Sequence, residues 1–215
     1  MGAREQLVDA GIRLLEEAGA EALRARTLAA EIGASTMAVY THFGGMPGLL
    51  DAIRQEAFVR FARQLREVPR TDDPVTDLFA LGLAYREYAM ANPQRYRLMF
   101  GVTAPGTGPR IDHDLTAKAL PTGRADVDTT FGQLVEAVRR CVAAGRLDDT
   151  DEVAVAGQIW SMAHGYVLLE IAGAFGEEGQ GLYGILGPLA VNLLVGLGDD
   201  REAALTSAAA AVTAG

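Results

Sequence analysis

The chain has little of what secreted, membrane and redox proteins usually carry. Of its 215 residues one is a cysteine, Cys141, so no disulfide can form within the chain and a reducing compartment is expected. No long run of uncharged apolar residues predicts a transmembrane helix, and the charged first residues lack the apolar core of a signal peptide. We therefore expect a cytoplasmic protein that is not in a membrane. Cys141 is expected to be a small buried hydrophobe, with a redox sensor as the weaker alternative.

Groups for catalysis are also scarce. The chain has three histidines, and it has no glycine-rich phosphate loop, no HExxH and no GxSxG motif. Asp112-His113-Asp114 is the one compact set of metal-type ligands. Consecutive side chains project in different directions, which favours a solvated loop over a metal site. We expect no enzyme, no metal and no cofactor.

Strand patterns are missing as well, which predicts an all-α fold. The expected helices are 3–18, 47 to just before Pro69, 74–91, 96–100, 126–144, 150–174 and 182–197. The Ala-rich tail 199–215 is either a last helix or a frayed end. Residues 101–124, with four glycines and three prolines, are expected to form a long connection. We predict a helix-turn-helix domain over 1–46 and a helical ligand-binding and dimerisation domain over 47–198.

The segment around Gly33 has the spacing of a helix-turn-helix. An apolar helical stripe (Leu28, Ala29, Ile32) stops at Gly33, where a tight turn can take a positive φ. Ser35 stands where an N-cap oxygen would satisfy the first free amides of a second helix. On that helix Val39 and Phe43 are one turn apart, so both are expected to face inward.

The opposite face of this second helix has the composition of a surface that enters a DNA groove. It carries small side chains, hydroxyls, one phenol and one imidazole: Thr36, Met37, Ala38, Tyr40, Thr41 and His42. We predict that Thr36, Ala38 and Thr41 contact base edges, with Met37 or Ala38 against a thymine methyl group. Arg26, Thr27, Tyr40 and His42 are expected to contact phosphates, and Ser35 belongs to the same surface.

The net charge of −9 is unevenly distributed. Residues 1–66 contain eight arginines and eight acidic residues, so the remaining 11 of 19 basic and 20 of 28 acidic residues give −9 in residues 67–215. The predicted DNA-binding segment is therefore neutral. This predicts a shallow salt dependence, with specificity that comes from base contacts and shape.

The N-terminal segment resembles the DNA-binding domain of the tetracycline-repressor (TetR) family of bacterial transcriptional regulators. The resemblance rests on a helix ending at Gly19, then Arg26-Thr27-Leu28-Ala29, Gly33-Ala34-Ser35, Val39-Tyr40-Thr41-His42-Phe43 and Leu49-Leu50. It implies a repressor that binds double-stranded DNA at a palindromic operator. Two positions depart from the family pattern. Arg24 stands where serine usually caps the second helix, and Met46 replaces a lysine that usually meets the DNA backbone.

The C-terminal part is similar to one subgroup of that family. Residues 85–100, YREYAMANPQRYRLMF, are similar to that subgroup's YxxFAxxNPxxYRLMF stretch. Trp160, followed by His164-Gly165, matches the tryptophan–histidine–glycine (WHG) signature that names the subgroup's domain. The resemblance implies an effector molecule but does not identify it.

Two late segments are apolar on more than one face, 159–175 and 182–197. Small residues along both would allow close helix packing. We predict a homodimer through helices of about 150–174 and 182–197, in a four-helix interface. The alternative is a hairpin buried within one chain. The resemblance favours the dimer, because family members pair through their last two long helices.

Aromatic and thioether side chains gather on the helices that follow the DNA-binding segment. A cavity of such residues with a few polar tips is the usual form of a small-molecule site. The predicted ligand residues are Tyr85, Tyr88, Tyr96, Met99, Phe100, Phe131, Trp160 and His164. For each residue taken singly, ordinary core packing is the favoured alternative. We expect a repressor released by a small apolar ligand, in preference to an enzyme or a scaffold protein.

Overall fold

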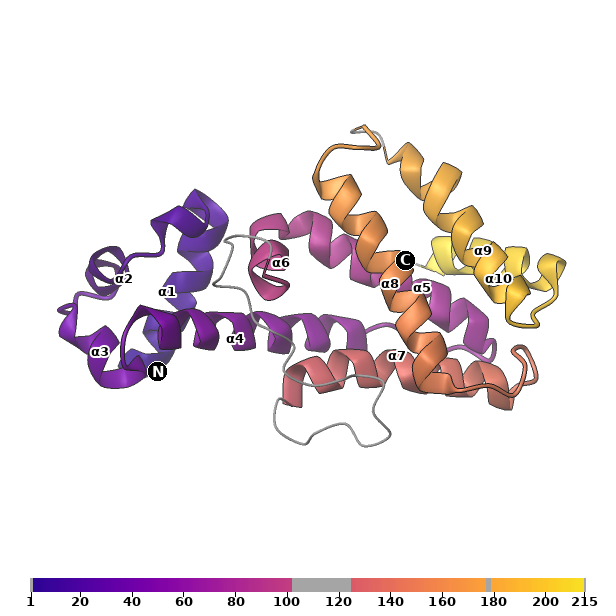
Figure 1. The fold of residues 1–215 in the computed structure, drawn as a ribbon, viewed down its shortest axis with the longest axis horizontal. Helices are drawn as coiled ribbons and strands as arrows, with labels where there is room; N and C mark the ends of the chain where they lie inside the picture. Colours follow the sequence, from indigo (N-terminus) through magenta and orange to yellow (C-terminus); the bar gives the residue numbers. More distant parts are fainter. Residues whose placement is uncertain (1, 102–124, 177–178, 215) are drawn as a thin grey trace. The chain divides into compact units, whose positions relative to one another are not determined.

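The structure is a computed structural model that describes residues 2–101, 125–176 and 179–214. Every regular element among these residues is helical, which confirms the predicted all-α fold (Figure 1). The helices are α1 Ala3–Ala18, α2 Ala25–Glu31, α3 Met37–Phe43, α4 Met46–Arg66, α5 Pro74–Ala91, α6 Pro93–Met99, α7 Ala125–Ala143, α8 Glu152–Ile171, α9 Gly187–Gly196 and α10 Arg201–Ala214. A short 3₁₀ turn, Ala20–Ala22, follows α1, and a π-helical turn, Leu182–Leu186, precedes α9.

Glycine and proline set several helix ends where the sequence predicts them. α1 ends before Gly19, which has a φ of 77° and donates its N–H to the Leu15 carbonyl at 3.0 Å. α5 runs from Pro74 to Ala91 as predicted, because the residue before Pro93 is disfavoured in the helical conformation. These stops need no long-range contact, so local sequence defines them.

The described residues divide into two compact units. The first contains residues 2–61 and 91–101, with α1 to α3, most of α4, and α6. The second contains residues 62–90, 125–176 and 179–214. The first unit therefore extends beyond the predicted segment 1–46, because α6 packs with the N-terminal helices.

A single apolar core holds the first unit together. Leu28, Val39 and Ile53, from α2, α3 and α4, are fully buried in it, and Leu98 brings in α6. Arg54 reinforces this contact, since its Nε donates to the Leu98 carbonyl at 3.4 Å. The second unit has its own core, in which α5, α7, α8 and α9 meet around Val75, Val138 and Val155.

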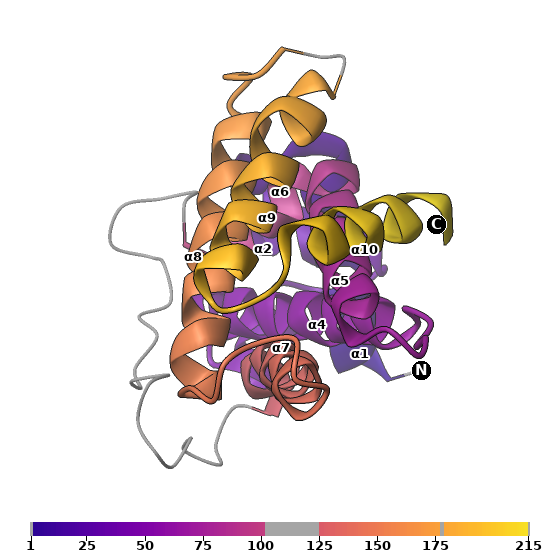
Figure 2. The same ribbon diagram turned by 90° about the vertical axis from the view of Figure 1, so that its right-hand side faces the viewer.

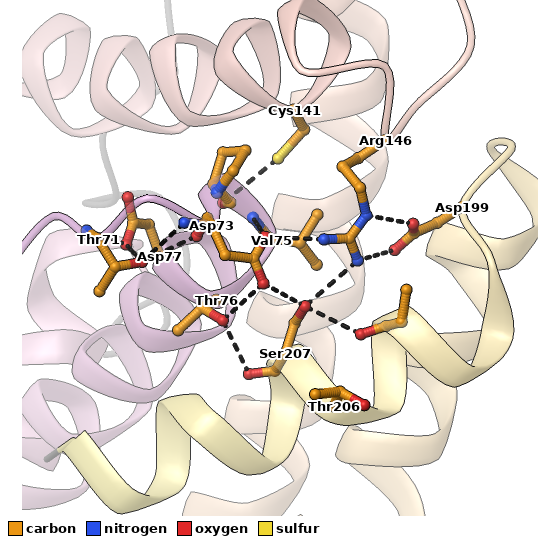
Figure 3. Close-up of polar contacts among 12 residues, drawn as sticks. Thr71, Asp73, Val75, Thr76, Asp77, Cys141, Arg146, Asp199, Thr206 and Ser207 are labelled. Carbon is orange, nitrogen blue, oxygen red and sulfur yellow. Dashed lines mark hydrogen bonds and ion pairs between the residues drawn. The ribbon is translucent and has the colours of Figure 1, made fainter.

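The Ala-rich tail is a regular helix of the second unit. α10 follows α9 and passes over α5 (Figure 2), with Ala204, Ser207 and Ala211 buried. Figure 3 shows the polar contacts that tie it down: Arg146, from the loop after α7, bonds to Asp199, to Asp73 and to Ser207 of α10.

This polar cluster sets one arginine, Arg146, between two carboxylates, Asp73 and Asp199. Burial alone would raise the pKa of Asp73, but hydrogen bonds from Ser207, Thr76 and the Val75 N–H, with the charge of Arg146, lower it overall. The hydrogen bond to Asp199 raises the pKa of Arg146. Burial raises the pKa of the nearby Cys141 thiol to about 12, and the side chain is fully buried, which is the environment expected of a small hydrophobe.

Two expectations for the C-terminal helices need correction. The helix predicted from residue 182 begins as a π-helical turn, in which the Gly187 N–H bonds to the Leu182 carbonyl. Pro188, in the first turn of α9, has no N–H to donate to a carbonyl of the preceding turn. The helix predicted to reach residue 174 ends at Ile171, because Gly173 takes a φ of 83°.

The predicted connection 101–124, apart from Gly101, and Asp112-His113-Asp114 within it lie outside the described residues. Among the helices that are described, none has the length and hydropathy of a membrane span.

Candidate functional site

The helix-turn-helix predicted around Gly33 is present in the first unit. Gly33 has a φ of 66°, and the Ala34 N–H bonds to the Ala29 carbonyl at 2.8 Å, as in a glycine-terminated helix end. α2 and α3 both pack on α1. The turn is therefore fixed by one glycine and by the apolar residues on either side of it.

α3 presents two different faces. Val39 is fully buried and Phe43 packs against the same core, as predicted. On the other face Met37 is 66% exposed and Tyr40 59% exposed. Ser35, Thr36, Thr41 and His42 are also exposed, and Ala38 is half-buried. The polar side chains of this exposed face make no hydrogen bond to any described residue. The structure thus brings the predicted residues of α3 onto one accessible surface.

Ser35 does not have the predicted capping role. α3 begins at Met37, and its N-cap is Thr36, whose side chain makes no capping hydrogen bond. Thr36 has a right-handed helical backbone, so the turn closes through backbone bonds from Ala38 to Ser35 (3.0 Å) and from Val39 to Thr36 (3.1 Å). The backbone carbonyls take the place of the expected serine oxygen.

Close approach of the backbone fixes the end of α3. Gly44 takes the left-handed conformation, φ 69°, and donates its N–H to the Tyr40 carbonyl at 2.9 Å. A Cβ at Gly48, in the first turn of α4, would lie 2.0 Å from the Phe43 carbonyl oxygen. Met46 packs against the first-unit core. The glycines therefore allow α4 to start directly against the last turn of α3.

Two of the four residues predicted to contact phosphates, Arg26 and Thr27, lie at the start of α2. Arg26 is exposed and Thr27 half-buried. Arg24 is the N-cap residue and makes no side-chain capping bond; its Nε donates to the Glu21 carbonyl at 3.2 Å. The first amides of α2 therefore have no side-chain cap from Arg24.

The sequence did not predict one residue that lies near this surface. The guanidinium carbon of Arg4, in the first turn of α1, lies 5.2 Å from the centroid of the Phe43 ring. This is a cation–π distance, and it sets an arginine beside the end of α3. No local pattern links residues 4 and 43, so the sequence held no signal for it.

Part of the predicted ligand site forms a cluster in the second unit. Trp160 Nε1 donates to Tyr85 Oη at 3.2 Å, and the same oxygen lies 3.2 Å from His164 Nδ1. The rings of Phe131 and Trp160 are 6.1 Å apart. Tyr88 is buried in this unit. Burial lowers the pKa of His164, which favours the neutral imidazole. The polar tips of the cluster are thus bonded to one another.

The other predicted ligand residues belong to the first unit. Tyr96 and Met99, on α6, are buried, and Phe100 follows at the end of the helix. The Phe100 ring is 4.8 Å from that of Tyr96 and 5.6 Å from that of Phe58. These three residues therefore belong to the first unit, in which the Phe100 ring contacts the rings of Tyr96 and Phe58.

A cavity of about 630 Å³ lies elsewhere in the second unit, between α5, α8, α9 and α10. None of the predicted ligand residues lines it. Residues of α10 form one wall, and the Ala-rich composition of that segment gave no sign of a binding surface.

Two family profiles match this chain in the order that the fold requires. Residues 7–53 match the profile described as "Bacterial regulatory proteins, tetR family". Residues 78–182 match the one described as "Tetracyclin repressor-like, C-terminal domain". The chain belongs to the TetR family. This confirms the resemblance to the TetR family drawn from the sequence, while membership of the WHG subgroup stays a prediction. The family is one of transcriptional regulators, not of enzymes.

Curated relatives agree with this assignment, and solved structures share the fold. The HTH-type transcriptional regulator Rv1816 of Mycobacterium tuberculosis is 30% identical over 160 residues, which are 71% of this chain and 64% of the relative. The match therefore covers less than two thirds of that relative's length. A protein of unknown function from Rhodococcus sp. RHA1 has the same fold, with a TM-score of 0.70, 24% identity and coverage of 92% and 96%. The structure of RolR in complex with resorcinol has a TM-score of 0.68 and 13% identity, and the match covers 95% of this chain and 92% of RolR.

Proposed function

We propose that the chain is a homodimeric DNA-binding transcriptional regulator, a repressor released from a palindromic operator by a small apolar ligand. The observation that carries this is the exposed face of α3. Its hydroxyls, phenol and imidazole are accessible and make no hydrogen bond to described residues, while Val39 fixes the helix from the opposite side. Such a helix can enter a major groove without losing internal contacts.

The positions of the side chains support a division of roles. Thr36, Ala38 and Thr41 read base edges, and Met37 reaches a thymine methyl group. Arg26, Thr27, Tyr40 and His42 contact phosphates, as do the first amides of α2, which have no side-chain cap from Arg24.

Exposed apolar residues favour dimerisation over a hairpin buried within one chain. Leu169 on α8 is 52% exposed, and Ile185 and Leu189, on the π-helical turn and α9, are 42% and 46% exposed. Burying these residues against the same face of a second chain would remove them from water. A two-fold dimer would carry two copies of α3, as a palindromic operator requires.

A ligand in the second unit would act by binding more tightly to a dimer that does not fit the operator. The aromatic side chains of the Trp160 cluster offer apolar contacts, while their polar tips are already bonded to each other. RolR, a protein with this fold, binds resorcinol, so the fold can hold a small molecule. α4 covalently links the first unit to the second, since it runs without interruption from Met46 to Arg66 and the boundary between the units lies within it.

The test is selection of genomic fragments by the purified protein, followed by titration of the selected fragment at two salt concentrations. We expect a palindromic fragment, bound by a dimer, with an affinity that falls modestly as salt rises. No enrichment over bulk DNA by a folded dimer would contradict the proposal. It would favour instead a ligand-binding or interaction protein that has a regulator's fold.

A further inference from the structure

The cavity between α5, α8, α9 and α10 exists because each wall supplies a small side chain. Gly82 of α5, Ala163 of α8, Ala190 of α9 and Ala208 of α10 all line it. A Cβ built at Gly82 would meet no atom within 4 Å, so the floor of the cavity is open space. Its volume of about 630 Å³ is that of a small-molecule site (Figure 2 shows the helices that surround it).

The lining is almost entirely hydrocarbon. Leucine, isoleucine, valine and alanine predominate, and Arg201 is the one charged residue among the lining residues. Its Nη2 donates to the side-chain oxygen of Asn192 at 2.9 Å, and both side chains are exposed at the edge. A charged group within the lining away from Arg201, which lies at the edge, would lose its hydration without gaining a partner.

We propose that this cavity binds an uncharged, mainly aliphatic small molecule. The inference rests on the proposed function and deepens it, because it gives the effector a chemical class and a place separate from the Trp160 cluster. Trp160 and His164 belong to that cluster, whereas Ile159, Met162 and Ala163, on the same helix, line the cavity.

The cavity is also separate from the surface proposed for dimerisation. Leu169, Ile185 and Leu189 are exposed, and none of them lines the cavity. A second chain can therefore cover these three residues without filling it. The cavity takes its walls from four helices and opens at Tyr183, Leu205 and Val212, which line it and are 68%, 53% and 47% exposed. An apolar space of this kind can admit and hold a small molecule.

The π-helical turn contributes residues both to the cavity and to the surface proposed for dimerisation. Leu182 and Leu186 line the cavity, while Ile185, between them, faces solvent. All three are in one five-residue turn, so a ligand that displaces Leu182 or Leu186 also moves Ile185. π-helical turns are frequent at functional sites. Occupancy of the cavity would therefore alter the dimerisation surface.

The experiment compares two fluorescent probes with the same ring system. N-phenyl-1-naphthylamine is uncharged, and 8-anilino-1-naphthalenesulfonate adds one negative charge. Each is titrated into the full chain. We expect saturable binding of one uncharged probe per chain, at least about tenfold tighter than binding of the sulfonate. Absence of saturable binding, or tighter binding of the sulfonate, would overturn the proposal.

Three variants test the location. Gly82→Leu and Ala208→Leu fill the cavity from two helices, and each should weaken binding of the uncharged probe about tenfold or more. Ala210→Leu is the matched control, because Ala210 is exposed on α10 and does not line the cavity. Its affinity should stay within about twofold of the parent. Thermal unfolding of each variant checks that it is folded.

The outcomes separate this inference from the proposed function. Parent-like probe binding by both lining variants would overturn the cavity site, while operator binding by the same proteins would leave the regulator proposal standing. Loss of probe binding in both variants, with no operator selected by the parent, would support the cavity and contradict the regulator proposal. Conversion of dimers to monomers by Ala208→Leu would show that the groove is the interface between copies, which also overturns the inference.

Discussion

The exposed face of α3, in the first unit, and the interior of the second unit use their polar side chains in opposite ways. On α3 of the first unit, Tyr40 and Thr41 are exposed and make no hydrogen bond to described residues. In the second unit, Arg146 makes two hydrogen bonds to Asp199, and Arg86 makes two to Glu170. Arginine–carboxylate pairs with this geometry are strong and directional.

This difference distinguishes side chains that can bind an external partner from side chains that hold the fold together. A polar group that is already paired inside the protein can contact a ligand only by giving up its partner, which costs about 1–3 kcal/mol. The paired groups of the second unit therefore hold helices in place. The unpaired groups of α3 are available to an external partner, for which DNA is the proposed candidate.

The largest expected effect comes from the backbone that holds α3. Gly48→Ala should lower the free energy of unfolding by about 2–4 kcal/mol and abolish operator binding, because the new Cβ would lie 2.0 Å from the Phe43 carbonyl oxygen. Chemical denaturation and DNA titration measure the two effects. Gly82→Ala is the control: its Cβ meets nothing within 4 Å, so its stability should equal or exceed that of the parent. Equal stability of Gly48→Ala and the parent would show that α4 does not constrain α3.

A second variant tests recognition without altering the fold. Thr41→Ala removes an exposed hydroxyl, and it should relax the preference at one base pair of each half-site by about 1–3 kcal/mol. Titration against operators mutated at each position measures this preference. An unchanged profile would exclude Thr41 from base contact.

The polar cluster around Asp73 predicts a pH dependence. Its folded pKa is lowered, so its contribution to stability is present above the unfolded value of about 3.9 and is lost as pH falls through the folded pKa. Asp73→Asn should destabilise the protein by about 1 kcal/mol at pH 7 and by less below about pH 4. Asp72→Asn, at an exposed neighbour, should change little. A cost of Asp73→Asn that stays constant down to pH 3 would contradict this role.

The smallest expected effect is at the start of α2. Arg24→Ser supplies the capping oxygen that the structure lacks, and it should raise the free energy of unfolding by about 0.5–1 kcal/mol. Urea denaturation measures it, with Arg24→Ala as the control for loss of the charge. A serine variant no more stable than the alanine variant would exclude capping.

Local sequence was sufficient to predict much of the fold. The ends of α1 and α5 depend on Gly19 and Pro93, and the two faces of α3 depend on the spacing of Val39 and Phe43. Each of these features is determined by residues within one or two helical turns. Local sequence also predicted which side chains at α3 are accessible. Their role in DNA binding remains a prediction.

Features that join distant residues could not be predicted in this way. Arg146 and Ser207 are 61 positions apart, and the cavity takes its walls from four helices. Tyr96 and Trp160 have similar apolar neighbours in the sequence, but the fold places them in different units. The π-helical turn does have a local cause, Pro188, yet an apolar run alone cannot distinguish it from an α-helix.

The most direct test compares one exposed tyrosine from each unit. Tyr40, on α3, and Tyr183, on the π-helical turn, are 59% and 68% exposed. Each is changed to alanine, and the selected operator is titrated at concentrations where both variants are dimers. We expect Tyr40→Ala to bind at least about tenfold more weakly than the parent, and Tyr183→Ala to bind like the parent. Parent-like binding by Tyr40→Ala would contradict the assignment of α3 as the DNA-binding surface.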